Sequence, residues 1–113
     1  FLKNKIASSS MTVPIPDGST VDLTIDITKE TTIEELNNLL KNYSENELKN
    51  IIGITYDPIV SSDVVRSTLS GLIDGLATMG INNKKIKLII WFDNGWGYAS
   101  RIIDTIKRLG QEL

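Results

Sequence analysis

The stretch WFDNGWGYASRIIDTIKRL covers residues 91 to 109. In it the polar trio Asp93, Asn94 and Gly95 interrupts the most hydrophobic part of the chain, and the spacing of apolar residues differs before and after the trio. Before the trio, KKIKLIIWFD at residues 84 to 93 is rich in β-branched and aromatic residues, which predicts a strand whose far end is buried on both faces. After it, apolar residues recur at helical spacing in one stripe: Tyr98, Ile102, Ile103, Ile106, Leu109 and Leu113. We therefore expect a strand, a polar corner and a closing amphipathic helix.

The N-terminal part of the chain predicts two extended arms. They lie in MTVPIPDGSTVDLTIDI, residues 11 to 27, on either side of a turn at Asp17-Gly18. Pro14 and Pro16 confine the first arm to a sheet edge or an irregular segment, because proline cannot donate to a strand ladder. In the second arm polar residues alternate with Val21, Leu23, Ile25 and Ile27, which predicts a half-buried strand.

A helix is predicted from about residue 32 to 43, where apolar residues fall at helical spacing. Thr31-x-x-Glu34 and Thr32-x-x-Glu35 both fit the capping box that begins a helix. Residues 51 to 56 then predict a buried strand that Asp57-Pro58 closes, and residues 61 to 68 predict a loop.

The last predicted elements before the closing strand are two short extended segments in LSGLIDGLATMGIN, residues 69 to 82, with glycines at the bends. The order of elements is thus strand, strand, helix, four strands and helix. It favours an α+β fold with a mainly antiparallel or mixed sheet and two helices over alternating βαβ units.

The composition limits the classes of function. The 113 residues fit one domain, and a net charge of −2 with 23% charged residues offers no electrostatic footprint for nucleic acid. No apolar run reaches the roughly 18 to 20 residues of a membrane-spanning helix and no signal peptide opens the chain, so we expect no membrane partner and a cytoplasmic location. The first residue is Phe1 rather than Met, and the chain reads as part of a longer protein.

The chain contains no cysteine and no histidine. Disulfides, thiolate nucleophiles, imidazole bases and the commonest zinc ligands are therefore excluded within it, and no metal site is predicted. Any chemistry must come from other polar side chains or from residues outside this chain.

Three polar groups have an ordinary explanation. Asp22 and Asp26 share a strand face and could act as paired carboxylates, but alternation on a solvated face accounts for them. A turn and an edge strand in solvent account for the basic residues Lys84, Lys85 and Lys87. Ser61-Ser62-Asp63 fits turn chemistry better than nucleophile activation, because no base accompanies it.

The polar corner at residues 93 to 95 has two interpretations. In the first, the Asn94 amide, with one acceptor and two donors, meets a ligand amide at the strand-to-helix junction. In the second, Asp93 or Asn94 caps the helix, while Gly95 and Gly97 relieve backbone strain.

Four stretches of the chain carry a family resemblance. WFDNGWGYASRIID at 91 to 104, VPIPDGSTVDLT at 13 to 24, LKNIIGITYDPIVSSD at 48 to 63 and GLIDGLATMGINNKKIKLIIWFDN at 71 to 94 resemble motifs of phosphorylating glyceraldehyde-3-phosphate dehydrogenases. The resemblance is colinear over nearly all of residues 3 to 109.

The resemblance implies that this chain corresponds to the C-terminal part of such an enzyme. Residues 1 to 93 would belong to the catalytic domain, and residues 94 to 113 would form a helix that returns to the nucleotide-binding domain. That domain, the catalytic cysteine and its activating histidine would all lie upstream. The implied cofactor is NAD or NADP, the implied assembly is a homo-oligomer, by resemblance a tetramer, and the chain alone would be inactive.

The resemblance also assigns residues to the cofactor site. Asn94 matches the asparagine that holds the nicotinamide carboxamide, and Tyr98 matches the tyrosine beside the nicotinamide ring. Asp93 and Gly97 match with a supporting role. No residue of this chain matches a catalytic one.

Two positions depart from the family pattern. Thr12 stands where the family has an arginine that binds phosphate, and a hydroxyl cannot replace a bidentate guanidinium. Gly95 stands where the family has glutamate, which removes one charge at the corner. These departures leave open a stand-alone, non-catalytic assembly or partner-binding module, and a relative that acts on another aldehyde such as erythrose 4-phosphate explains the sequence less well.

Overall fold

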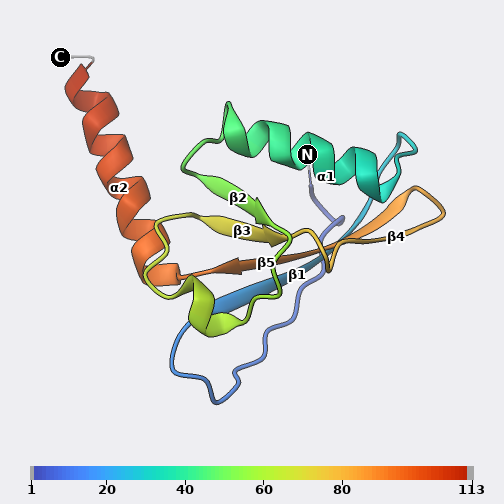
Figure 1. The fold of residues 1–113 in the computed structure, drawn as a ribbon, viewed down its shortest axis with the longest axis horizontal. Coiled ribbons are helices and arrows are strands. Elements are labelled where there is room, and N and C mark those ends of the chain that lie inside the picture. The colour runs from blue at the N-terminus through green and yellow to red at the C-terminus, as the bar shows by residue number, and fades with distance from the viewer. Residues whose placement is uncertain (1, 112–113) are drawn as a thin grey trace.

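The computed structural model describes residues 2–111 of the chain. Figure 1 shows α1 alongside β2, and α2 projecting away from the sheet at the end of β5. The elements in chain order are β1 (Ser19–Asp26), α1 (Ile33–Glu45), β2 (Ile52–Thr55), the 3₁₀ helix η1 (Ser61–Val64), β3 (Gly71–Asp74), β4 (Met79–Ile81), β5 (Lys85–Phe92) and α2 (Asn94–Gln111).

The five strands form one mixed sheet in the order β1-β5-β3-β2, with β4 pairing to β5 as well. Only β2 and β3 are parallel, and the other pairs are antiparallel. The α+β fold with two helices is therefore confirmed. The first predicted arm forms no strand, because residues 11 to 18 run irregularly through the two prolines before β1 begins. Part of the predicted loop at 61 to 68 is the helix η1.

The core lies between the sheet and α1. Its buried residues are Ile73, Ile86 and Leu88, and partly buried side chains from α1 and the neighbouring strands pack against them: Ile25, Ile27, Leu36, Leu40, Ile52, Ile54 and Ile90. The predicted burial of the far end of β5 on both faces is wrong, since residues 89 to 92 are only half-buried. A single helix layer covers the sheet, so this end of β5 lacks a second layer.

The second predicted strand is confirmed as β1, but its burial is uneven. Ile25 is half-buried, whereas Val21 and Leu23 are 41% and 36% exposed. The core cluster contacts the Ile25 end of the strand. Alternation therefore predicted the strand correctly and overestimated how much of it the core covers.

The beginning of α1 follows the predicted capping box. Thr32 Oγ1 accepts a hydrogen bond from the Glu35 backbone N–H at 3.1 Å, and the Glu35 carboxylate accepts one from the Thr32 N–H at 3.0 Å. The Thr31 hydroxyl also donates to Glu35. Of the two boxes in the sequence, the structure uses the pair Thr32 and Glu35.

The polar groups with an ordinary explanation are paired or form turns. Lys85 contacts Asp26 at 2.6 Å, and Lys87 contacts Asp22 at 2.7 Å, across the antiparallel pair of β1 and β5. Neither a paired-carboxylate site nor an unpaired basic patch forms there. The Asp63 carboxylate accepts from the Val60 backbone N–H at 2.7 Å, which is turn chemistry.

The turn before β1 forms as predicted. Gly18 has a φ of 91°, and its N–H donates to the Asp17 carboxylate at 2.7 Å. A Cβ atom at Gly18 would lie 2.7 Å from the Ser61 carbonyl oxygen, so the turn packs closely against η1. Neither helix of the described part has the length and hydrophobicity that crossing a membrane requires.

Candidate functional site

The candidate site is the corner between β5 and α2, and Asp93 is its centre. This residue is 2% exposed. Its Oδ1 atom accepts from the Trp96 backbone N–H at 2.8 Å, and its carbonyl oxygen accepts from the Gly97 N–H at 3.0 Å. Asp93 is therefore the N-cap of α2, and Asn94 is not.

The second oxygen of Asp93 joins the corner to the loop after η1. Oδ2 accepts from the Arg66 backbone N–H at 2.8 Å, and Arg66 has a φ of 64°, in the left-handed region. Hydrogen bonds from the backbone N–H groups of Trp96 and Arg66 hold the pKa of the Asp93 carboxyl below its ordinary value, against the opposing effect of burial. The corner thus contains a stable anion at the N-terminus of a helix.

Gly97 lets α2 approach the loop before β3. It is buried, and a Cβ atom there would lie 2.7 Å from the Leu69 carbonyl oxygen. Gly95 has only an ordinary contact at 3.5 Å, with Asp93. Neither glycine has a positive φ, so the prediction that they relieve backbone strain is wrong. Close approach explains Gly97.

Asn94 is the first residue of α2 and its side chain is exposed. Within residues 2–111 its amide makes no hydrogen bond, so both the donor and the acceptor atoms remain open to a ligand. Tyr98 lies four residues later, on the same face of the helix, and is 70% exposed. The two predicted cofactor residues therefore lie together on one exposed face beside the corner.

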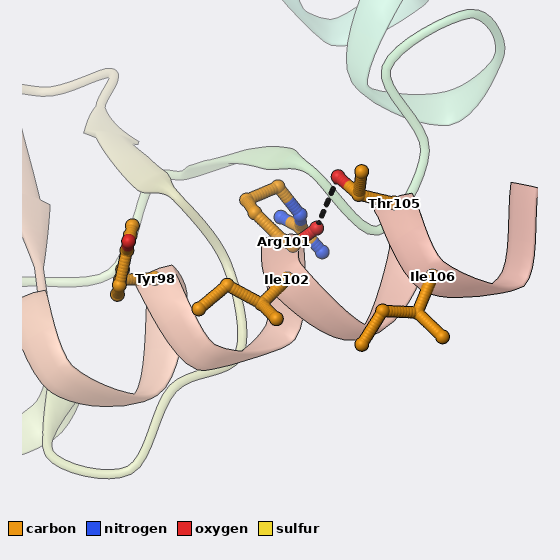
Figure 2. Close-up of a pocket in the computed structure, with 5 residues that line it drawn as sticks. All are labelled: Tyr98, Arg101, Ile102, Thr105 and Ile106. Carbon is orange, nitrogen blue, oxygen red and sulfur yellow. Dashed lines mark hydrogen bonds between the residues drawn. The ribbon is translucent and has the colours of Figure 1, made fainter. Parts of the chain in front are cut away.

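A shallow groove of about 230 Å³ continues this face along α2. Its lining residues are Tyr98, Arg101, Ile102, Thr105 and Ile106. Figure 2 shows Ile102 and Ile106 on one side of the helix, with Thr105 donating its hydroxyl to the Arg101 carbonyl oxygen. The predicted apolar stripe is exposed at Ile102, Ile103, Ile106 and Leu109, and Leu113 lies outside the described residues.

Arg101 is a residue that the sequence analysis missed. Its guanidinium donates to Ser70 Oγ at 3.1 Å, to the Asn50 carbonyl oxygen at 3.2 Å and to Asp104 Oδ2 at 2.9 Å. The sequence did contain a signal for it, because Arg101 and Asp104 lie three residues apart within the motif WFDNGWGYASRIID.

Thr12, the predicted phosphate position, lies in the irregular segment before β1 and is exposed. Its hydroxyl makes no hydrogen bond with the residues that the structure describes. Within residues 2–111, no hydrogen bond or ion pair links Thr12 to the corner at Asp93.

The sequence of this chain matches a known protein family. Residues 1–94 match the protein family described as "Glyceraldehyde 3-phosphate dehydrogenase, C-terminal domain", which is most of the chain. The chain belongs to this family. The match to the glyceraldehyde 3-phosphate dehydrogenase C-terminal domain ends at Asn94, the first residue of α2.

Individual glyceraldehyde-3-phosphate dehydrogenases are similar over almost the whole chain. The protein of Borreliella burgdorferi is 46% identical over 110 residues, which cover 96% of this chain and 33% of that protein. The Geobacillus stearothermophilus protein is 45% identical over 103 residues, covering 91% and 31% respectively. A relative from Pisum sativum, named as cytosolic, is 38% identical over 112 residues, covering 99% and 33%. The chain thus spans about a third of the length of these relatives and corresponds to their C-terminal domain.

Proposed function

We propose that this chain is the C-terminal part of an NAD(P)-dependent glyceraldehyde-3-phosphate dehydrogenase, which oxidises an aldehyde phosphate in glycolysis. The observation that carries the proposal is the pair Asn94 and Tyr98, exposed on one face of α2 directly after the buried Asp93. In this proposal the chain supplies sheet scaffold, subunit contacts and one side of the nicotinamide pocket. An upstream nucleotide-binding portion supplies the other side.

The residues at the corner suit a nicotinamide. The Asn94 amide is unused within the described chain and offers the donor and acceptor atoms that complement a carboxamide. The exposed ring of Tyr98 provides a flat surface beside it. When bound, the dinucleotide supplies the hydride acceptor. The role of this chain is to orient the ring, because Asp93 holds the first turn of α2 in place.

The chemical steps belong elsewhere in the proposed enzyme. A covalent thioester mechanism needs a thiolate, and this chain has no cysteine and no histidine to activate one. The purified 113-residue chain should therefore have no dehydrogenase activity of its own. Thr12 offers a hydroxyl in place of the family's arginine, so this chain lacks the bidentate phosphate contact that the arginine would make.

The proposal includes a cytoplasmic homo-oligomer, by family resemblance a tetramer. Relatives named as cytosolic, such as the one from Pisum sativum, support this location. The choice between NAD and NADP would depend on upstream residues that contact the ribose.

A second candidate function is a stand-alone module for assembly or partner binding. The exposed apolar side chains of α2 favour it: Ile102, Ile103, Ile106 and Leu109 are 43% to 63% exposed in the described chain. A contiguous apolar surface of this kind marks an interaction site. In the enzyme hypothesis the same surface packs on the nucleotide-binding portion.

Asn94→Ala in the full-length polypeptide tests the enzyme hypothesis. An unpaired ligand amide costs about 1 to 3 kcal/mol, so cofactor affinity should fall roughly five- to more than hundredfold. Turnover should fall as well, since the ring loses its orientation. Fluorescence titration with NAD and NADP and steady-state kinetics measure both effects.

Asn38→Ala is the matched control, because Asn38 is an exposed asparagine on α1. It should leave cofactor affinity and turnover unchanged. If Asn94→Ala behaves like this control, the nicotinamide contact is refuted. If the unmutated full-length polypeptide neither binds the cofactor nor turns over substrate, the module becomes the better hypothesis.

A further inference from the structure

One side chain connects α2 to the sheet. The Arg101 guanidinium reaches Ser70 Oγ at 3.1 Å and the Asn50 carbonyl oxygen at 3.2 Å, and its side chain is 27% exposed. Asp104, one turn further along α2, contacts the same guanidinium at 2.7 Å. Arg101 thus joins three segments that are up to 51 residues apart in sequence.

Both partners of Arg101 outside α2 lie just before the paired strands β2 and β3. The Ser70 backbone N–H donates to the Ile51 carbonyl oxygen at 2.7 Å, at the point where β2 and β3 begin their parallel pairing. Asn50, with a φ of 64°, directly precedes that point. Contacts of Arg101 with this paired end of the sheet can therefore fix the orientation of α2 relative to the sheet.

Two residues of α2 make close contacts with the segments before β2 and β3. Gly97 lies against Leu69, and Arg101, one turn later, donates to Ser70. The apolar residues Ile102, Ile103, Ile106 and Leu109 are exposed. Because 18 residues of helix extend about 27 Å, a small rotation of α2 at these contacts would move the rest of the helix.

We propose that Arg101 is a positioning residue: its guanidinium sets the orientation of α2, and with it the position of Asn94 and Tyr98 toward the nicotinamide. The role in cofactor orientation rests on the proposed function. A guanidinium suits this task because its planar fork donates in several fixed directions at once. The ammonium of a lysine is a point charge and cannot make the same set of contacts.

The orientation of α2 can be measured in the 113-residue chain without any activity. The chain has no cysteine, so Asn38→Cys on α1 and Lys107→Cys on α2 introduce two unique sites for nitroxide labels. Pulsed electron paramagnetic resonance, with labelled chain diluted in unlabelled chain, then records the distance between the two helices. We expect one narrow distance distribution that Arg101→Met and Arg101→Lys broaden or shift.

Ser100→Ala is the control for this measurement. The Ser100 hydroxyl donates to the Trp96 carbonyl oxygen at 2.8 Å, within α2 itself. This variant should keep the narrow distribution. An unchanged distribution in Arg101→Met would overturn the proposal.

A double-mutant cycle in the full-length polypeptide tests whether Arg101 positions Asn94 toward the nicotinamide. Arg101→Met should lower kcat/KM for the cofactor roughly ten- to hundredfold, because a misplacement of about 1 Å costs up to about 100-fold. The KM for phosphate should not change. If Arg101 acts through Asn94, combining Arg101→Met with Asn94→Ala should cost less than the product of the single losses.

The outcomes separate this inference from the proposed function. Losses that multiply, with a normal distance distribution, show that Arg101 does not position Asn94. An Asn94→Ala variant with normal cofactor affinity refutes the nicotinamide contact itself, while the label distances still decide whether Arg101 orients α2.

Discussion

The backbone N–H of Arg66 donates to the Asp93 carboxylate at 2.8 Å across 27 residues of sequence. The other oxygen of the same carboxylate accepts from the first turn of α2, at Trp96. One buried side chain thus connects the loop after η1 to the beginning of the terminal helix. The exposed amide of Asn94 is held at this connection.

Asp93→Asn should lower the melting temperature at neutral pH by several degrees, because an amide replaces a carboxylate that accepts two backbone hydrogen bonds. The folded state lowers the pKa of Asp93 below 3.8, so its stabilisation is complete above that unfolded-state value. The stabilisation is lost as pH falls through 3.8 toward the lower folded pKa. The difference in melting temperature between the wild type and Asp93→Asn should therefore become smaller at acidic pH.

Thermal unfolding from about pH 3 to pH 7 measures this gap. Glu47→Gln, at an exposed residue of the loop after α1, controls for the loss of one negative charge and should change little. A gap that is equal at all pH values would contradict the role of the ionised carboxylate.

Gly97→Ala should destabilise the chain or displace α2, although alanine is the better helix former by about 1 kcal/mol. The added Cβ would lie 2.7 Å from the Leu69 carbonyl oxygen, a backbone atom that cannot move aside cheaply. Gly110→Ala is the matched control on the same helix, since nothing lies within 4 Å of its Cβ position. That variant should be neutral or slightly stabilised in urea unfolding. Equal behaviour of the two variants would disprove the close approach.

The exposed stripe of α2 should cause the 113-residue chain to self-associate. Ile102→Asp and Ile106→Asp, at residues that are 43% and 63% exposed, should shift sedimentation toward the monomer. Lys107→Gln, also on α2, lowers the net charge by one, as each Ile→Asp substitution does, and controls for that change. A wild-type chain that is monomeric at all concentrations by light scattering would show that this surface does not drive association.

Thr12→Arg in the full-length polypeptide should tighten phosphate binding if position 12 lies at the phosphate site. A charge-assisted bidentate contact contributes about 1.5 to 3 kcal/mol, or roughly ten- to hundredfold in affinity. Steady-state kinetics with varied phosphate and aldehyde phosphate measure the change. Thr12→Lys, with the same charge but no fork, should give a smaller gain. Unchanged Michaelis constants would place phosphate binding elsewhere.

Much of the fold follows from patterns that extend over a few residues. The capping box of Thr32 and Glu35 joins positions three apart, and it predicted the beginning of α1 correctly. Strict alternation predicted β1, and the change of period after Asp93 predicted the boundary between β5 and α2. In each case the interactions that form the element lie within the segment that displays the pattern.

Other features depend on segments that meet only in the folded chain. The Arg66–Asp93 hydrogen bond, the contact of Arg101 with Asn50 and the parallel pairing of β2 with β3 all join distant positions. The burial of β5 depends likewise on α1 covering one face of the sheet. No periodicity records which backbone groups will become neighbours.

Asn94 shows how the two kinds of information combine. The sequence predicted its place at a polar strand-to-helix corner. It also left two roles open for Asn94, a helix cap or a ligand contact. Only the folded structure resolved which side chain caps α2, because Asp93 is buried with both oxygens bonded while the Asn94 amide is exposed. Adjacent polar residues carry equivalent local signals, and the tertiary environment alone determines which one is desolvated and satisfied by backbone N–H groups.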